Sequence, residues 1–253
     1  TDNNEFNFFN PKAGIYAKID KHNEAYASVS MAKREPLRTD LKESIKNGGT
    51  KTIKPEQMLD YEVGYKYNNK IISANLNLYY MDYNDQLVQT GKLNDVGYKL
   101  MENVANSYRT GIEIGLAVKP VKWLKWDGNI TLSENKIKNY IAYYDLYDNS
   151  YDYNWLGQES ESLKSTDISF SPNTVASSLL TLNATKDLSF NFMSKYVSKQ
   201  YCDNTSNDNR SLDAYFVNNA SVNYTFKANK DMDINLQFIV NNVFDEKYVA
   251  NAW

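Results

Sequence analysis

The sequence has almost none of the residues from which disulfides, metal sites and hydrolytic centres are built. Cys202 is the only cysteine and His22 the only histidine among 253 residues. One thiol cannot close an intrachain disulfide, and a zinc site of cysteine and histidine ligands cannot be assembled. A Ser–His–Asp triad would need His22, which lies in an expected tight turn. We therefore expect no enzyme activity, no catalytic residue, no metal site and no cofactor.

Long apolar runs and a strong net charge are also missing. No stretch approaches the ~18 apolar residues of a transmembrane helix, and mean hydropathy is low at -0.63. The net charge of -3 argues against a nucleic-acid partner. The first residues, TDNNE, have neither the basic region nor the apolar core of a signal peptide. If the protein is exported, we expect the chain to be a fragment.

What the sequence does have is a repeated alternation of polar and apolar residues, as in 76–80 (LNLYY) and 234–240 (INLQFIV). A period of two places the apolar side chains on one face of a strand. Strands are predicted at about 11–20, 24–34, 57–67, 71–89, 104–118, 122–136, 172–184, 187–200, 212–227 and 231–243.

The connectors between these ten strands alternate between very short and long. Tight turns are expected at 21–23, 68–70, 119–121, 185–186 and 228–230, and long loops at 35–56, 90–103, 137–170 and 201–211. Short turns on one side and long loops on the other are typical of an outer-membrane β-barrel. A soluble β-sandwich or soluble barrel alternates equally well, but its strands average about five or six residues. The predicted fold class is all-β: an antiparallel transmembrane β-barrel wall.

Aromatic residues gather at the ends of the expected strands, which fits two girdles at the membrane interfaces. Those near short turns are Tyr65, Tyr67, Trp123, Trp126, Tyr224 and Phe226, and those near a long loop are Tyr79, Tyr80 and Tyr83.

Five stretches carry a family resemblance: 9–16 (FNPKAGIY), 26–36 (YASVSMAKREP), 53–66 (IKPEQMLDYEVGYK), 106–113 (NSYRTGIE) and 240–248 (VNNVFDEKY). In this order they resemble motifs in the C-terminal β-barrel of TonB-dependent outer-membrane receptors. The overall sequence resembles receptors from Bacteroidetes-type bacteria. The resemblance implies a 22-stranded barrel in the outer membrane of a Gram-negative bacterium. About ten strands of it fall in residues 1–253, a single-domain fragment without the plug, the TonB box or the closing strand.

The resemblance also implies the partners and the function. The outer face would contact membrane lipid, the barrel's own N-terminal plug domain would fill the lumen, and the TonB complex would act through the plug. The cargo would be a small metal chelate, with a ferric siderophore as the leading expectation. Cobalamin, haem or a glycan remain open, as does a passive porin or adhesin without energised transport.

Two arginines are candidates for ligand contact. Arg34 and Arg38 flank Pro36, where a strand enters the first long loop, and arginine binds carboxylate or phosphate bidentately. The alternative is an internal ion-pair lattice or a contact with the plug. Glu62 and Glu113 are expected on the lumen face, paired with basic groups of the wall or plug rather than with ligand.

The longest loop is rich in aromatic and acidic residues. Stacking faces beside hydrogen-bond acceptors suit a flat, catecholic or sugar ligand. The candidate contacts are Tyr143, Tyr144, Tyr147, Tyr151, Tyr153 and Trp155. Alternatively, the loop packs only on itself, or Asp145, Asp148 and Asp152 hold calcium, although their spacing matches no EF-hand.

Overall fold

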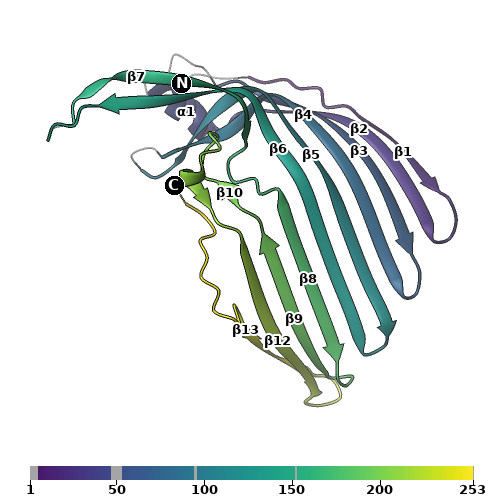
Figure 1. The fold of residues 1–253 in the computed structure, drawn as a ribbon. Helices are drawn as coiled ribbons and strands as arrows, with labels where there is room; N and C mark the ends of the chain where they lie inside the picture. The colour runs from purple at the N-terminus through teal and green to yellow at the C-terminus, as the bar shows by residue number, and fades with distance from the viewer. Residues whose placement is uncertain (1–4, 47–52, 94–95, 152, 253) are drawn as a thin grey trace.

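A computed structural model of the protein describes residues 5–46, 53–93, 96–151 and 153–252. One curved antiparallel sheet holds most of the chain (Figure 1). Its strands are β1 (Lys12–Lys18), β2 (Asn23–Arg34), β3 (Glu56–Asn68), β4 (Ile72–Leu93), β5 (Lys99–Val121), β6 (Leu124–Tyr147), β7 (Trp155–Asp167), β8 (Thr174–Asn183), β9 (Leu188–Val197), β12 (Tyr215–Lys227) and β13 (Asp233–Val240). The order is sequential, β1 and β13 are open edges, and β7 pairs only with β6.

The predicted sorting of connectors onto two ends is confirmed. The five short turns join β1 to β2, β3 to β4, β5 to β6, β8 to β9 and β12 to β13, and they lie at the lower end of Figure 1. The opposite end carries the remaining connections, with helix α1 (Arg38–Lys46), the short pair β10 (Gln200–Tyr201) and β11 (Ser211–Leu212), and the 3₁₀ turn η1 (Asp208–Arg210). No helix in the described ranges is long and apolar enough to cross a bilayer.

The predicted apolar faces form continuous rows across the strands. Successive cross-strand partners from β1 to β6 are Ile15, Ala27, Val63, Leu78, Ile112 and Leu132. A second row from β6 to β13 is Leu124, Leu182, Phe190, Val222 and Phe238. Most of these side chains are exposed, for example Val63 at 55% and Phe238 at 68%. A wall that bears apolar rows on one face and polar residues on the other fits a lipid-facing exterior and a polar lumen.

The second predicted aromatic girdle is only partly correct. Tyr80 lies on the outward face and stacks on Tyr108 at 6.1 Å between ring centroids. Tyr79 lines a cavity on the opposite, lumen face, and Tyr83, four residues along the same strand, shares that face. Adjacent residues of a strand cannot share a face, so Tyr79, Tyr80 and Tyr83 divide between the two sides.

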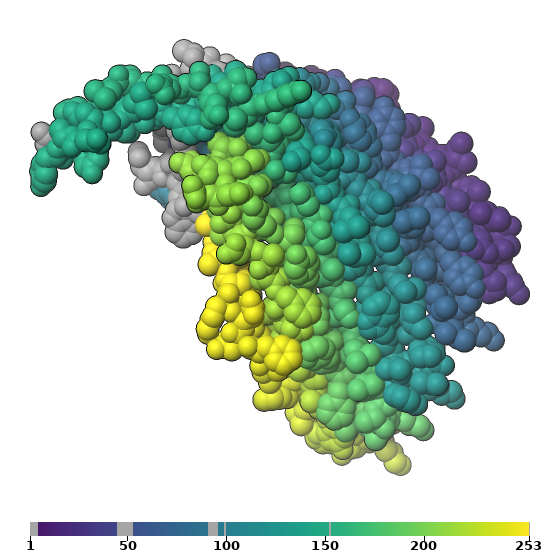
Figure 2. Space-filling model, viewed as in Figure 1, coloured from purple at the N-terminus to yellow at the C-terminus, as the bar shows by residue number. Residues whose placement is uncertain are grey.

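The prediction of one long loop over 137–170 is wrong. Most of it is a β-hairpin, because β6 runs on to Tyr147 and β7 returns from Trp155, and the hairpin extends past the wall (Figures 1 and 2). The lower half of β6 pairs with β8 instead. Lys136 pairs with Asp167 and Leu132 with Thr174, so the β7–β8 side contains three extra residues. Strands β7 and β8 therefore act as one wall strand interrupted by a bulge, which reconciles ten predicted wall strands with eleven observed.

The other long connectors are also more ordered than predicted. Helix α1 lies within the first loop, β4 and β5 extend to within a few residues of each other, and the 201–211 loop contains η1.

Strand β6 reverses the facing of its side chains at Asn139. Below this residue the odd-numbered Ser133 and Asn135 line the lumen cavity. Above it Tyr140 donates to Glu102 Oε1 at 2.8 Å, and the even-numbered positions face the interior. The change of phase falls at a left-handed residue, because Asn139 has φ +53°.

Candidate functional site

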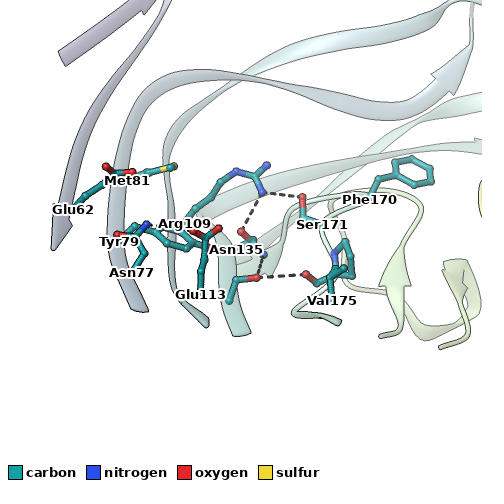
Figure 3. A pocket seen from close by; sticks show the side chains of 12 residues that line it. Glu62, Asn77, Tyr79, Met81, Arg109, Glu113, Asn135, Phe170, Ser171 and Val175 are labelled. Carbon is teal, nitrogen blue, oxygen red and sulfur yellow. Dashed lines mark hydrogen bonds between the residues drawn. The ribbon is translucent and has the colours of Figure 1, made fainter. Parts of the chain in front are cut away.

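A cavity of about 360 Å³ lies on the lumen face of the wall (Figure 3). Side chains from β3 to β6 and the β7–β8 bulge form it: Glu62, Asn77, Tyr79, Met81, Arg109, Glu113, Ser133, Asn135, Phe170, Ser171, Pro172 and Val175. It contains both a guanidinium and carboxylates, so its polar chemistry suits a partner with charges of both signs.

Arg109 is held in place by neutral partners. Its Nη1 donates to Asn135 Oδ1 and to Ser171 Oγ, both at 3.1 Å. Within the described residues, no carboxylate forms an ion pair with it. The described wall therefore does not neutralise the positive charge of Arg109, which faces the lumen. Arg109 was not among the predicted site residues, although its position two residues from the lumen-facing Gly111 places it on that face.

Glu62 and Glu113 lie on the lumen face as predicted. Glu113 Oε2 accepts from Asn77 Nδ2 at 3.2 Å, and Glu62 Oε2 accepts from Ser28 Oγ at 3.4 Å. Neither forms an ion pair with a basic residue in the described part of the chain. Their predicted pairing with basic groups of the wall is therefore absent among these residues, and pairing with a plug stays a prediction.

Two tyrosines lie flat along the lumen wall, each over a glycine of the next strand. A Cβ added to Gly64 would come within 2.1 Å of the Tyr26 ring, and one added to Gly111 within 2.6 Å of the Tyr79 hydroxyl. Tyr26 reaches on to Asn77, whose Oδ1 accepts from its hydroxyl at 3.0 Å. The glycines therefore keep these rings out of the lumen.

The β7–β8 bulge is fastened to the wall above the cavity. Ser133 Oγ donates to Pro172 O at 3.4 Å, and Ile168 N donates to Asn135 O at 3.0 Å. Phe170 has φ +51°, which is unusual for a bulky residue. The bulge thus projects inward at a fixed position and forms the upper rim of the cavity.

Next to the bulge, the 201–206 connection forms a shelf centred on Asn204. Asn204 is fully buried; its Oδ1 accepts from Ser169 N at 2.9 Å and its Nδ2 donates to Gln89 O at 2.7 Å. Asp203 Oδ2 accepts from Arg210 Nη1 at 2.8 Å and raises the pKa of that guanidinium. A small apolar core of Val88, Val104, Ile137 and Ile168 lies at this end of the wall.

The two arginines predicted to bind ligand lie apart from this cavity. Arg34 pairs with Glu56 Oε1 at 3.0 Å, while Glu56 Oε2 accepts from Leu87 N at 3.0 Å. This single ion pair is of the kind given above as the alternative, and ligand contact by Arg34 stays a prediction. Arg38 is exposed at the start of α1.

The six predicted aromatic contacts do not form one cluster. Tyr144 is on the interior face of the hairpin, donates to Glu161 Oε2 at 3.3 Å and lies near Arg210. The opposite face carries Tyr143 and Tyr147, together with Trp155, whose Nε1 donates to Asp145 at 3.4 Å. Tyr151 and Tyr153 project at the tip, with exposures of 99% and 70%.

Asp148 organises the hairpin tip through hydrogen bonds to its neighbours. Its carboxylate accepts from Ser150 Oγ, and from Asn154 N at 2.9 Å and Asn154 Nδ2 at 3.0 Å. These bonds hold the pKa of Asp148 at about 2. No group of three metal-binding side chains occurs in the ranges that the structure describes, and Asp152 lies outside them.

The chain is similar to known outer-membrane receptors. The family model "TonB dependent receptor-like, beta-barrel" matches residues 1–243. The ferric-catecholate import receptor Fiu from E. coli K12 is 20% identical with a TM-score of 0.61, over 95% of this chain and 31% of that one. The siderophore receptor PiuA from Acinetobacter baumannii is 19% identical with a TM-score of 0.65, over 96% and 32%.

The copper transporter OprC is 18% identical with a TM-score of 0.66, over 95% of this chain and 35% of that one. The chain thus spans about a third of the length of these proteins, and at such identities the likeness shows the fold alone. No curated protein matches the chain. The bacterial lineage stays a prediction. With the polar lumen, the apolar exterior and the sorted connectors, the family match establishes that the chain belongs to the TonB-dependent receptor β-barrel family, whose members lie in the Gram-negative outer membrane.

Proposed function

We propose that this chain forms part of the wall of a receptor that imports a scarce nutrient, with an iron chelate as the cargo. The observation that carries the proposal is the lumen face, where Arg109, Glu62 and Glu113 present charges that the described wall leaves without ion pairs. Such a surface suits a protein plug with charged side chains of both signs, through which the TonB complex would act.

The iron chelate is proposed because several similar structures are receptors for siderophores or ferric chelates. A copper transporter of the same fold makes a second metal cargo the main alternative. Cobalamin, haem and glycans are the remaining cargoes in this scheme, and a passive pore is the alternative without energised transport.

Growth under iron limitation tests the cargo. A strain without the complete receptor gene is expected to lose growth on one ferric chelate and to regain it from a plasmid copy. Normal growth of the deletion strain on every ferric chelate tried would refute the proposal that the cargo is an iron chelate. The same assay in a strain without TonB separates import from passive diffusion, because a porin would continue to work.

The hairpin geometry singles out Tyr144 among the predicted ligand contacts. It faces the interior near Arg210, whereas Tyr147 lies on the other face of the same hairpin. In the complete receptor, Tyr144→Ala is expected to weaken chelate binding about 5- to 150-fold, the range for a lost aromatic contact of about 1–3 kcal/mol. Tyr147→Ala is the matched control, and an equal loss in both variants would refute this assignment.

A further inference from the structure

The β6–β7 hairpin has an open strand edge of its own above the wall. Strand β7 pairs with β6 alone, and β9, the next strand of the wall, ends at Val197 (Figure 1). The shelf reaches only the lower end of β7, where Asp167 N donates to Ser206 Oγ at 2.7 Å. In the described part of the chain, no hydrogen bond joins residues 157–163 to any residue outside the hairpin.

The hydrogen-bonding register identifies which main-chain groups of this edge are free. Asp148 N donates to Asn154 O at 2.9 Å, so the even-numbered residues of upper β6 direct their main-chain groups at β7. Their partners in β7 are Glu159, Glu161 and Leu163. Successive residues of a strand alternate in this direction. The residues whose main-chain N–H and C=O groups point away from β6 are therefore Gln158, Ser160 and Ser162.

This edge lacks most of the features that keep other strands from pairing with it. Edge strands are commonly blocked by proline, by charged side chains, especially lysine, or by a covering segment. The stretch 157–163, GQESESL, contains no proline and no lysine, and residues 158–162 are all exposed. Its only charges are those of Glu159 and Glu161, which repel an acidic strand and attract a basic one.

The charge of the whole hairpin favours the same kind of strand. Residues 139–163 contain five acidic side chains and no lysine or arginine. Glu159 and Glu161 lie two residues apart on the interior face, and neither forms an ion pair within the ranges that the structure describes. Antiparallel pairing of two copies about Ser160 would place Glu159 opposite Glu161 of the second copy, where like charges destabilise a sheet.

We propose that the outer edge of β7 binds an extended, basic segment of a partner polypeptide by strand addition. Main-chain hydrogen bonds to Gln158, Ser160 and Ser162 would hold the segment, as in other complexes in which a peptide extends a sheet. Lysine or arginine at alternate positions of the segment would then lie opposite Glu159 and Glu161 on one face. The proposal does not depend on the identity of the cargo.

The test uses the complete receptor, purified in detergent and titrated with a synthetic peptide in which lysine and threonine alternate. Glu159→Gln with Glu161→Gln is expected to weaken binding about 2- to 30-fold, because two cross-strand charge pairs are lost. The matched control is Asp187→Asn with Asp231→Asn, the same change of charge at the short-turn end, and is expected to bind as the unchanged receptor does. An equal loss in both double variants, or no binding to the unchanged receptor, would overturn the proposal.

A second peptide separates strand addition from attraction between opposite charges. It has the same composition, but its lysines and threonines alternate in pairs, so that no two lysines are two residues apart. Only one of the two glutamates can then face a lysine, and binding is expected to be about 1.5- to 5-fold weaker. Equal binding of the two peptides would contradict pairing in a strand register.

Hydrogen exchange locates the contact on the receptor. The amides of Gln158, Ser160 and Ser162 are expected to exchange fast in the free receptor and to become protected by the alternating peptide. Protection before the peptide is added would show that another part of the receptor covers this edge, which would overturn the proposal. Ser160→Pro removes an outward N–H and no bond to β6, so unchanged peptide binding in this variant would also overturn it. The heat-dependent gel shift of folded barrels shows that each variant has assembled before it is titrated.

Discussion

At the scale of single residues, two glycines leave room for tyrosine rings to lie along the lumen wall instead of projecting into the lumen. The three atoms nearest to a Cβ added at Gly64 all belong to the Tyr26 ring, the closest at 2.1 Å. At Gly111 the neighbours include the backbone oxygen of Leu132 at 2.6 Å. A side chain at Gly64 therefore displaces a movable ring, whereas one at Gly111 also strains the sheet itself.

Gly64→Ala is expected to destabilise the barrel by about 1–3 kcal/mol, because the added methyl group pushes Tyr26 off the wall. The hydrogen bond from Tyr26 to Asn77 would be lost with it. In a Tyr26→Ala background the same change should cost much less, since the ring is no longer there. Urea unfolding of the complete receptor in detergent measures both, and equal costs in the two backgrounds would contradict the explanation.

Asp148 gives a pH-dependent prediction for the hairpin tip. Its pKa is lowered to about 2 by hydrogen bonds from Ser150 and Asn154. A lowered carboxyl pKa stabilises the tip at pH values above the unfolded pKa of about 3.9, and this stability is lost as pH falls through about 2. A carboxyl NMR titration should place the pKa of Asp148 near 2; a value as high as that of an ordinary aspartate, about 3.9, would contradict the explanation.

At the scale of elements, the bulge and the shelf form one extracellular unit. Asn204 connects the bulge backbone at Ser169 with the end of β4 at Gln89, and is itself completely buried. A buried amide with these partners specifies the arrangement of three chain segments at once.

Asn204→Ala is expected to destabilise this unit by about 1–3 kcal/mol, because it leaves buried backbone groups without partners. Hydrogen exchange should become faster in the 168–173 and 201–206 segments and stay unchanged at the short turns. The neighbouring exposed Asn207→Ala is the comparison. Exchange that is unaltered in the bulge would show that Asn204 does not join the segments.

The sequence predicts the wall strands well because Leu76, Leu78 and similar residues alternate along a face that contacts lipid. The prediction of a long loop over 137–170 is wrong for a physical reason. A hairpin beyond the membrane has no lipid-facing side, so Tyr143 and Tyr144 can follow each other without an apolar alternation. No local sequence pattern predicts the hydrogen bond between Arg109 and Ser171, because Ser171 lies in a bulge 62 residues away.

At the scale of the whole molecule, the described sheet has two free edges, β1 and β13. Unpaired edge strands with exposed apolar side chains such as Ile15 and Phe238 are sites for pairing between chains. The sequence predicts both edges correctly, because it indicates a wall of ten strands that does not close.

Residues 1–253 expressed alone in detergent are therefore expected to form polydisperse assemblies through β1 and β13. Size-exclusion chromatography with light scattering measures this. Proline substitutions at Gly14 and Gln237, whose N–H groups point to the open edges, should shift the distribution to smaller species. A single monomeric peak from the unchanged fragment would contradict this expectation.

The left-handed residue Asn139 has a practical consequence for anyone mapping this barrel by labelling. With Cys202 replaced, no native thiol remains, and single cysteines can be introduced along β6 one at a time. The positions that face the interior are odd-numbered below Asn139 and even-numbered above it, so the assignment of faces must shift by one residue at Asn139. A scan interpreted with one fixed parity would assign the whole upper hairpin inside out.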